Sequence, residues 1–246
     1  MKDKLQPVLE LFSIGKIIII GLAIFAGSTF YMYILTKQIA VSAILGIFAM
    51  IFGFYHSVYL PKKMNREQYL LKELQRYGIS MTFYLQSGYN VLQALNLSKQ
   101  KLDKQIKKDI EKTMIKLEEE AVLDTTHFKK YKFNALDIFH QILEIKYIEG
   151  GDSKNLFTKA NESMNFEIVK RDELYRRKKQ VMKRIMIMLG ITASIPVILA
   201  FSASELYEQF LTMGFYAIGL NVVLFILMQI SLFFLQKNAT DISISK

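Results

Sequence analysis

Few residues of this 246-residue chain have the types and spacing that catalysis or metal binding requires. The three histidines, His56, His127 and His140, are scattered, and their spacing matches no zinc site. None of them has a Ser or Cys arrangement beside it that resembles a catalytic triad. The chain has no cysteine, which excludes disulfides and thiolate metal sites. We therefore expect no catalytic, cofactor-binding or metal-binding residues.

Two titratable residues in the middle of the chain have alternative interpretations. His140 follows Leu136 by four positions, so we expect a hydrogen-bonded residue of a helical bundle rather than a ligand. Glu149 stands before Gly150 and Gly151 and could bind a cation or a partner, although a capping or solvated role is the more common one. No G-x-x-x-x-G-K-[ST] motif is present, so the chain has no recognisable phosphate-binding loop of its own.

Charged and apolar residues are sharply segregated, and this segregation predicts an all-α membrane protein. Hydrophobic residues make up 52% of the sequence and charged residues 22%, yet four stretches contain no Asp, Glu, Lys or Arg. Each is long enough, at about 1.5 Å of rise per residue, to cross a hydrocarbon core of roughly 30 Å. The predicted transmembrane spans are 17–36, 39–60, 185–204 and 214–236. A cleaved signal peptide is the alternative for the first span, but its apolar stretch continues for a full membrane thickness.

These spans divide the chain into three regions. Residues 1–61 contain a short N-terminal segment and a transmembrane hairpin, 62–184 form a water-soluble block, and 185–246 contain a second hairpin and a short tail.

Polar and small residues within the predicted spans suggest how the spans pack. Asn221 and Gln229 are eight residues apart, hence on nearly one face of the fourth span, and interhelical hydrogen bonds would explain both. A transporter or channel is the alternative, but no charged residue within the spans supports ion coupling. Small residues recur four positions apart in the first two spans, at Ala23, Gly27, Ser42 and Gly46. This spacing predicts a closely packed hairpin.

The distribution of basic residues predicts the orientation. Most of the 32 Lys and Arg residues, and nearly all of the net charge of +10, lie in the block 62–184. Because basic flanks remain in the cytoplasm, we expect this block and both termini to be cytoplasmic, with the turns near Lys37 and Glu205 facing outward. Basic residues beside the spans favour anionic lipid headgroups. Nucleic-acid binding is not expected, because no aromatic-interleaved strand or finger spacing accompanies the charge.

Amphipathic patterning within 62–184 predicts a bundle of helices. Apolar residues at three- and four-residue steps predict helices over about 64–88, 91–97, 102–117 and 133–149. The last of these is expected to place Ile145 inward. A final helix with Leu156 on its apolar face has no Gly or Pro before Gly190, so we expect it to run straight into the third span.

Glycines mark two corners between these helices. Gly88 follows one helix, and Gly150 with Gly151 follows another. Glycine can close a helix in the left-handed conformation, and Asn90 or Asp152 can then cap the next helix through its side-chain oxygen. We therefore expect positive φ angles at these corners.

With both corners placed, the chain resembles the type II secretion F family, the inner-membrane platform proteins of secretion systems and type IV pili. The resembling residues are Leu85, Gly88, Ala94 and Leu95 at the first corner and Glu149, Gly150 and Gly151 at the second. The single predicted bundle is similar to the short B and C proteins of tight-adherence (Tad) pili. One departure is that Asp152, rather than the family's Gly-x-Leu pattern, follows the second corner.

The resemblance implies a non-enzymatic platform in a bacterial or archaeal cytoplasmic membrane. It implies a cytoplasmic ATPase, pilin-like subunits and a second platform protein, identical or related, as partners. A membrane-anchored scaffold unrelated to secretion is a further alternative to this function.

Overall fold

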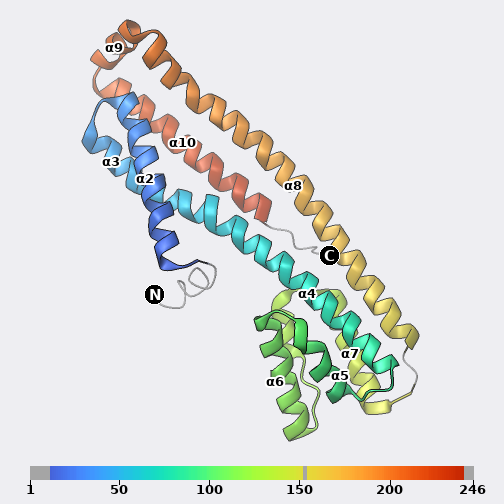
Figure 1. Cartoon of the computed structure of the whole chain (residues 1–246). Coiled ribbons are helices and arrows are strands. Elements are labelled where there is room, and N and C mark those ends of the chain that lie inside the picture. Colours follow the sequence, from blue (N-terminus) through green and yellow to red (C-terminus); the bar gives the residue numbers. More distant parts are fainter. Residues whose placement is uncertain (1–11, 152–153, 241–246) are drawn as a thin grey trace. The chain divides into compact units, whose positions relative to one another are not determined.

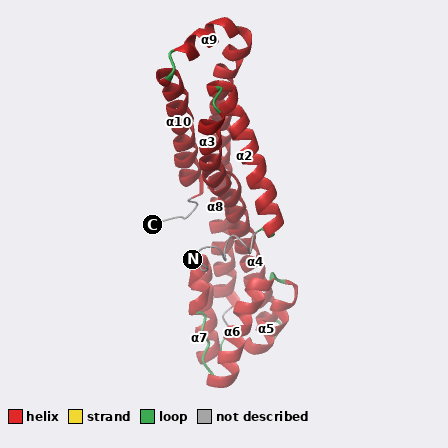
Figure 2. Ribbon diagram, turned by 90° about the vertical axis from the view of Figure 1, so that its left-hand side faces the viewer, coloured by secondary structure: helices red, strands yellow, loops and turns green. Residues whose placement is uncertain are grey.

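The computed structural model describes residues 12–151 and 154–240, and all the regular structure within them is helical (Figure 1, Figure 2). The longer helices are α2 (Ile14–Thr36), α3 (Ile39–Gly53), α4 (Leu60–Gln86), α6 (Lys104–Glu120), α7 (Asn134–Glu149), α8 (Lys154–Ser202) and α10 (Phe215–Thr240). The shorter ones are the π-helical η1 (Phe54–Tyr59), α5 (Val91–Ser98), the 3₁₀ helices η2 (Lys99–Lys101) and η3 (Thr126–Tyr131), and α9 (Ser204–Thr212).

Four helical stretches are long and apolar enough to cross a membrane. They are Ile14–Thr36, Ile39–Gln86, Lys154–Ser202 and Phe215–Leu235. Each contains or largely overlaps one predicted span. The prediction of an all-α chain with four helices able to cross a membrane is therefore confirmed. The chain has the make-up of a multi-pass membrane protein.

The ends of two predicted spans differ from the structure. The helix that contains the second predicted span, 39–60, does not end with that span, because η1 and α4 extend it to Gln86. A π-helical turn leaves room for the Pro61 ring, which would otherwise meet the carbonyl four residues earlier. The helix that contains the third predicted span ends at Ser202, and the turn expected near Glu205 contains the short helix α9.

The chain divides into two compact units. One, the membrane unit, comprises the described residues up to Met64 and those from Tyr175 onward; the other, the bundle unit, is Asn65–Leu174. Helices α4 and α8 contribute residues to both units without a break.

In the membrane unit, α2 and α3 form a hairpin (Figure 1). The two helices approach closely at Gly46. A Cβ atom on Gly46 would overlap the Thr29 hydroxyl and lie 3.2 Å from the Phe25 ring, so only glycine fits without a shift. Gly27, predicted to share this role, has open space where a Cβ atom would stand. The buried apolar cluster is small and consists of Met32, Leu45, Ala49 and Phe225.

The bundle unit has a continuous apolar core. Its fully buried side chains include Leu74, Met81, Ile106, Ile110, Leu136, Phe139 and Met164. Two predicted inward residues are wrong: Ile145 is 47% exposed and Leu156 is 48% exposed. The buried face of α8 instead begins at Phe157, because that helix meets the core one residue later than the sequence pattern suggested.

Candidate functional site

The first glycine corner has the conformation that the sequence predicts. Helix α4 ends at Gln86, Gly88 has φ +90°, and the Tyr89 amide donates to the Tyr84 carbonyl oxygen at 3.1 Å. Asn90 then caps α5: its Oδ1 accepts from the Gln93 amide at 2.8 Å, and the Gln93 side chain accepts from the Asn90 amide at 3.3 Å. This reciprocal capping box satisfies two donors that a helix start would otherwise leave free.

The other residues of the first motif are structural. Leu85, Ala94 and Leu95 are all buried in the core of the bundle unit. They anchor the corner in this core, whereas Gly88 itself is exposed.

The second corner also has positive φ angles, +74° at Gly150 and +72° at Gly151. The Gly150 amide donates to the Lys146 carbonyl at 3.1 Å, and the Lys146 ammonium donates to the Gly151 carbonyl. Glu149 is exposed, and no group of three metal-ligating side chains exists among the described residues. The predicted cap at Asp152 lies outside the described residues.

A surface groove lies between the first corner and the last turn of α7, which precedes the second corner. It encloses about 450 Å³ and is lined from the first corner by Leu85, Tyr89, Asn90, Val91 and Leu92, from α6 by Leu117, and from the last turn of α7 by Lys146 and Tyr147. The Tyr147 hydroxyl donates to the Ala121 carbonyl at 3.2 Å, which fixes that last turn against the end of α6. We call this the corner groove.

The residues that line the corner groove are better suited to binding a segment of another protein than to catalysing a reaction. Its floor consists of leucine and valine side chains, and its rim offers two phenols, an amide and the single cation Lys146. The lining contains neither a nucleophile next to a base nor a pair of carboxylates. An apolar peptide side chain flanked by a carboxylate would find complementary partners there.

The histidines are not assembled into a site. His56 lies in the membrane unit among the rings of Phe52 and Phe233. In the bundle unit, His127 Nε2 lies 2.8 Å from the Asp109 carbonyl oxygen.

His140 is buried as predicted, but it is not hydrogen-bonded. Neither ring nitrogen has a hydrogen-bond partner, and the nearby Tyr77 hydroxyl has none either, with the two ring centroids 5.9 Å apart. Loss of solvent, and secondarily the charge of His127, lowers the pKa of His140 to about 3, while burial raises the pKa of Tyr77. The expectation of a hydrogen-bonded histidine is therefore wrong: the His140 ring packs against the rings of Phe128 and Phe139 instead.

Carboxylates that the sequence analysis did not select, two of them buried, hold the bundle helices together. Asp109 of α6 accepts from Lys130 Nζ at 2.6 Å and from the Tyr131 hydroxyl at 2.6 Å, which ties η3 to α6. Glu73 of α4 accepts from the Asp103 amide at 2.9 Å. Arg66 forms a bidentate ion pair with Asp103. The hydrogen bonds from Arg66 are the main cause of the lowered pKa of the Asp103 carboxyl. Because all of these carboxylates are engaged, they stabilise the bundle and do not form an acid–base site.

Asn221 and Gln229, predicted to act alike, have different surroundings in the structure. The Asn221 amide donates to the Leu35 carbonyl at 3.2 Å, and the Tyr207 hydroxyl donates to the same oxygen at 2.9 Å. The predicted interhelical hydrogen bond of Asn221 is therefore confirmed. Gln229 instead lines a cavity of about 200 Å³ among α2, α8 and α10, and Tyr31 belongs to the same lining.

No family model, curated protein or solved structure matches this chain.

Proposed function

We propose that this protein is an integral membrane platform of a type II secretion or Tad-like type IV pilus machine. In this role it couples a cytoplasmic ATPase to the assembly of pilin-like subunits. The observation that carries the proposal is the corner groove, in which the two motifs behind the family resemblance line or adjoin one surface. The sequence has no phosphate-binding loop, so a partner would supply the nucleotide hydrolysis.

Helix α8 supplies a path for force in this proposal. Its N-terminal part is fixed in the bundle core by Phe157, Ala160, Met164 and Ile168, and the same unbroken helix continues to Ser202. A displacement of the bundle unit by the ATPase would therefore reach the membrane through a hydrogen-bonded main chain rather than through a loop.

The corner groove can be tested as the ATPase contact. A photoreactive benzoylphenylalanine replacing Tyr89, which is exposed and lines the groove, should crosslink to a secretion-type ATPase in cells. The same probe replacing Lys108, on the exposed side of α6, is the matched control and should give no such product. Crosslinking from Lys108 but not from Tyr89 would contradict this contact, and the absence of any co-purifying ATPase would contradict the platform function.

The orientation is part of the proposal and has its own test. We place the bundle unit and both termini in the cytoplasm of a bacterial or archaeal cell, because most basic residues lie between the second and third spans. The cysteine-free chain allows single-cysteine labelling. Lys37→Cys and Gln209→Cys should react with an impermeant reagent outside intact cells, whereas Lys108→Cys should react only after lysis. Labelling of Lys108→Cys from outside would reverse the orientation.

Self-association, or pairing with a related platform protein, is supported by the outer face of α7. Ile138, Ile145 and Ile148 are exposed there, on the side away from the buried Leu136 and Leu143. Contiguous exposed apolar side chains mark interaction surfaces in soluble regions. Ile145→Glu should therefore lower the mass of the detergent-solubilised assembly in light scattering, whereas Lys108→Glu should leave it unchanged.

A transporter or channel is the second candidate, favoured by the cavity beside Gln229. Ser28 and Tyr31 also line it, and polar side chains within spans commonly mark transport paths. Its lining has no charged residue, which weighs against ion coupling. Solute flux into proteoliposomes that Gln229→Leu abolishes would favour this function over the platform.

A further inference from the structure

Helix α9 joins two membrane spans with almost no intervening chain. Ala203 separates it from the end of α8, and Met213 with Gly214 separates it from the start of α10. Both connections are sharp, since Ala203 has φ −132° and ψ 53° and Gly214 has φ +62°. Because both neighbours are candidate spans that end here, α9 must lie at the membrane boundary on this side.

The two faces of α9 differ strongly in polarity. At about 100° per residue, Glu205, Glu208, Gln209 and Thr212 share one side of the helix, and Leu206, Tyr207, Phe210 and Leu211 share the other. No Lys or Arg occurs between Ile185 and Gln236. Amphipathic helices of this kind lie in the plane of the membrane interface with the apolar side toward the acyl chains.

One edge of the apolar side is attached to the protein. Tyr207 is buried, and its hydroxyl donates to the Leu35 carbonyl at 2.9 Å, an acceptor in the last turn of α2 that Asn221 also contacts. The carbonyls in the last turn of a helix have no intrahelical partner, so these donors satisfy a group that the end of α2 leaves open. The hydrogen bond of Tyr207 fixes the rotation of α9 about its own axis. It therefore also sets the direction in which the other apolar residues of α9 point.

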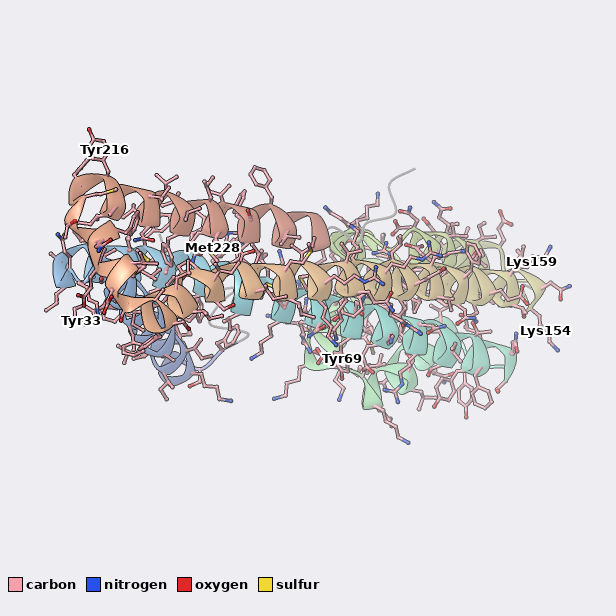
Figure 3. The ribbon with its side chains drawn as sticks, turned by 90° about the horizontal axis from the view of Figure 1, so that it is seen from above. Tyr33, Tyr69, Lys154, Lys159, Tyr216 and Met228 are labelled. Carbon is pink, nitrogen blue, oxygen red and sulfur yellow. The ribbon has the colours of Figure 1, made fainter. Side chains whose placement is uncertain are left out.

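The other edge is uncovered. Leu206 is 68% exposed, and flanking residues at the adjoining helix ends are exposed as well, Phe215 by 85% and Tyr216 by 81%. Figure 3 shows the Tyr216 side chain projecting away from the ribbon. Exposed aromatic residues at the ends of spans are typical of the interfacial zone of a bilayer.

We propose that α9 is an interfacial anchor that inserts Leu206 into the phospholipid leaflet on its side of the membrane, with Phe215 and Tyr216 at the headgroup level. Glu205 and Glu208 then face water. Since the helix carries acidic and no basic residues, insertion depends on apolar burial, and anionic lipid or salt should not strengthen it. This anchor is independent of the proposed platform function.

Tryptophan fluorescence tests the anchor, because the chain contains no native tryptophan. The full-length variants Leu206→Trp and Glu208→Trp would be reconstituted into neutral phosphatidylcholine vesicles containing lipid brominated near the headgroup. We expect Leu206→Trp to lose about half of its emission and Glu208→Trp less than about a tenth, because interfacial helices bury only one face. Leu227→Trp, at an exposed position within α10, should respond most strongly to bromine near the chain ends and so verifies insertion.

Each other result overturns the anchor. With Leu227→Trp quenched, an unquenched and water-like Leu206→Trp would mean that the apolar edge faces water or awaits a protein partner. Equal quenching of Leu206→Trp and Glu208→Trp would mean that α9 is not oriented by its two faces. Quenching of Leu206→Trp only when anionic lipid is added would assign the contact to headgroup charge.

Discussion

The bundle unit and the membrane unit pack their helices by different means. In the bundle, large side chains such as Phe139 and Leu136 are fully buried in one core. In the membrane unit, large side chains such as Phe30 and Ile44 point outward, and the helices approach through Gly46 and through hydrogen bonds to the Leu35 carbonyl. Lipid tails are as apolar as leucine, so burying leucine between spans gains little, whereas in water it supplies most of the folding free energy. The same substitution should therefore have different effects in the two units.

Truncating a bundle core residue should have the largest effect. Phe139→Ala removes a fully buried ring and should lower the free energy of unfolding of the bundle by about 3–5 kcal/mol. Hydrogen exchange of α7 peptides in the full-length protein would measure this loss. Leu224→Ala, at an outward position of α10, is the control and should change stability by less than about 0.5 kcal/mol. Equal losses of stability in Phe139→Ala and Leu224→Ala would contradict the view that the two units are stabilised by different means.

Replacing His140 should stabilise the bundle. His140→Leu removes two buried nitrogens that lack hydrogen-bond partners, so we expect a gain of about 1–3 kcal/mol in the same hydrogen-exchange measurement. A loss of stability would show that these nitrogens have partners in solution, such as an internal water.

The same substitution should alter the dependence of stability on pH. An unfolded histidine binds a proton near pH 6.5, whereas burial holds the pKa of His140 in the folded protein to about 3. The unfolded state therefore binds more protons between these values, and stability is full above about pH 6.5 and falls by up to about 1.4 kcal/mol per pH unit below it. His140→Leu should remove this contribution, and an unchanged acid slope would contradict it.

Filling the close approach in the membrane unit should have a moderate effect. Gly46→Ala forces a Cβ atom against the Thr29 hydroxyl and should cost about 1–3 kcal/mol by overpacking. Thermal unfolding followed by circular dichroism in detergent would detect it. Gly27→Ala, where the space is open, should leave the melting temperature unchanged. A similar response from both glycines would mean that α2 and α3 do not pack at Gly46.

The second glycine corner should show the smallest change in stability and, under the proposed function, a large change in output. Gly150→Val at φ +74° should cost about 1–2 kcal/mol of backbone strain. Pilus or secretion output should fall while the protein still inserts at a normal level, because α8 would leave the corner in another direction. Gly190→Ala within α8, where nothing lies near a Cβ atom, should retain output. Normal pilus or secretion output from Gly150→Val would show that the conformation of this corner is not needed to couple the bundle unit to assembly.

The sequence by itself determined the features that depend on neighbouring residues. Uncharged runs of sufficient length predicted the four candidate spans, and glycine followed by Asn90 predicted the first corner, because length, charge and φ are local properties. The positive φ angles of Gly150 and Gly151 were predictable for the same reason.

Only the tertiary structure decided which apolar face is buried and which polar group is satisfied. Helix α7 has isoleucines on its outer face as well as a buried face, so periodicity could not exclude Ile145 from the core. His140 was expected to be hydrogen-bonded, yet its partners had to come from other helices that supply none. The corner groove likewise depends on residues from α5, α6 and α7 meeting at one place. These contacts depend on how the helices pack against one another, which cannot be read from the sequence of any one helix.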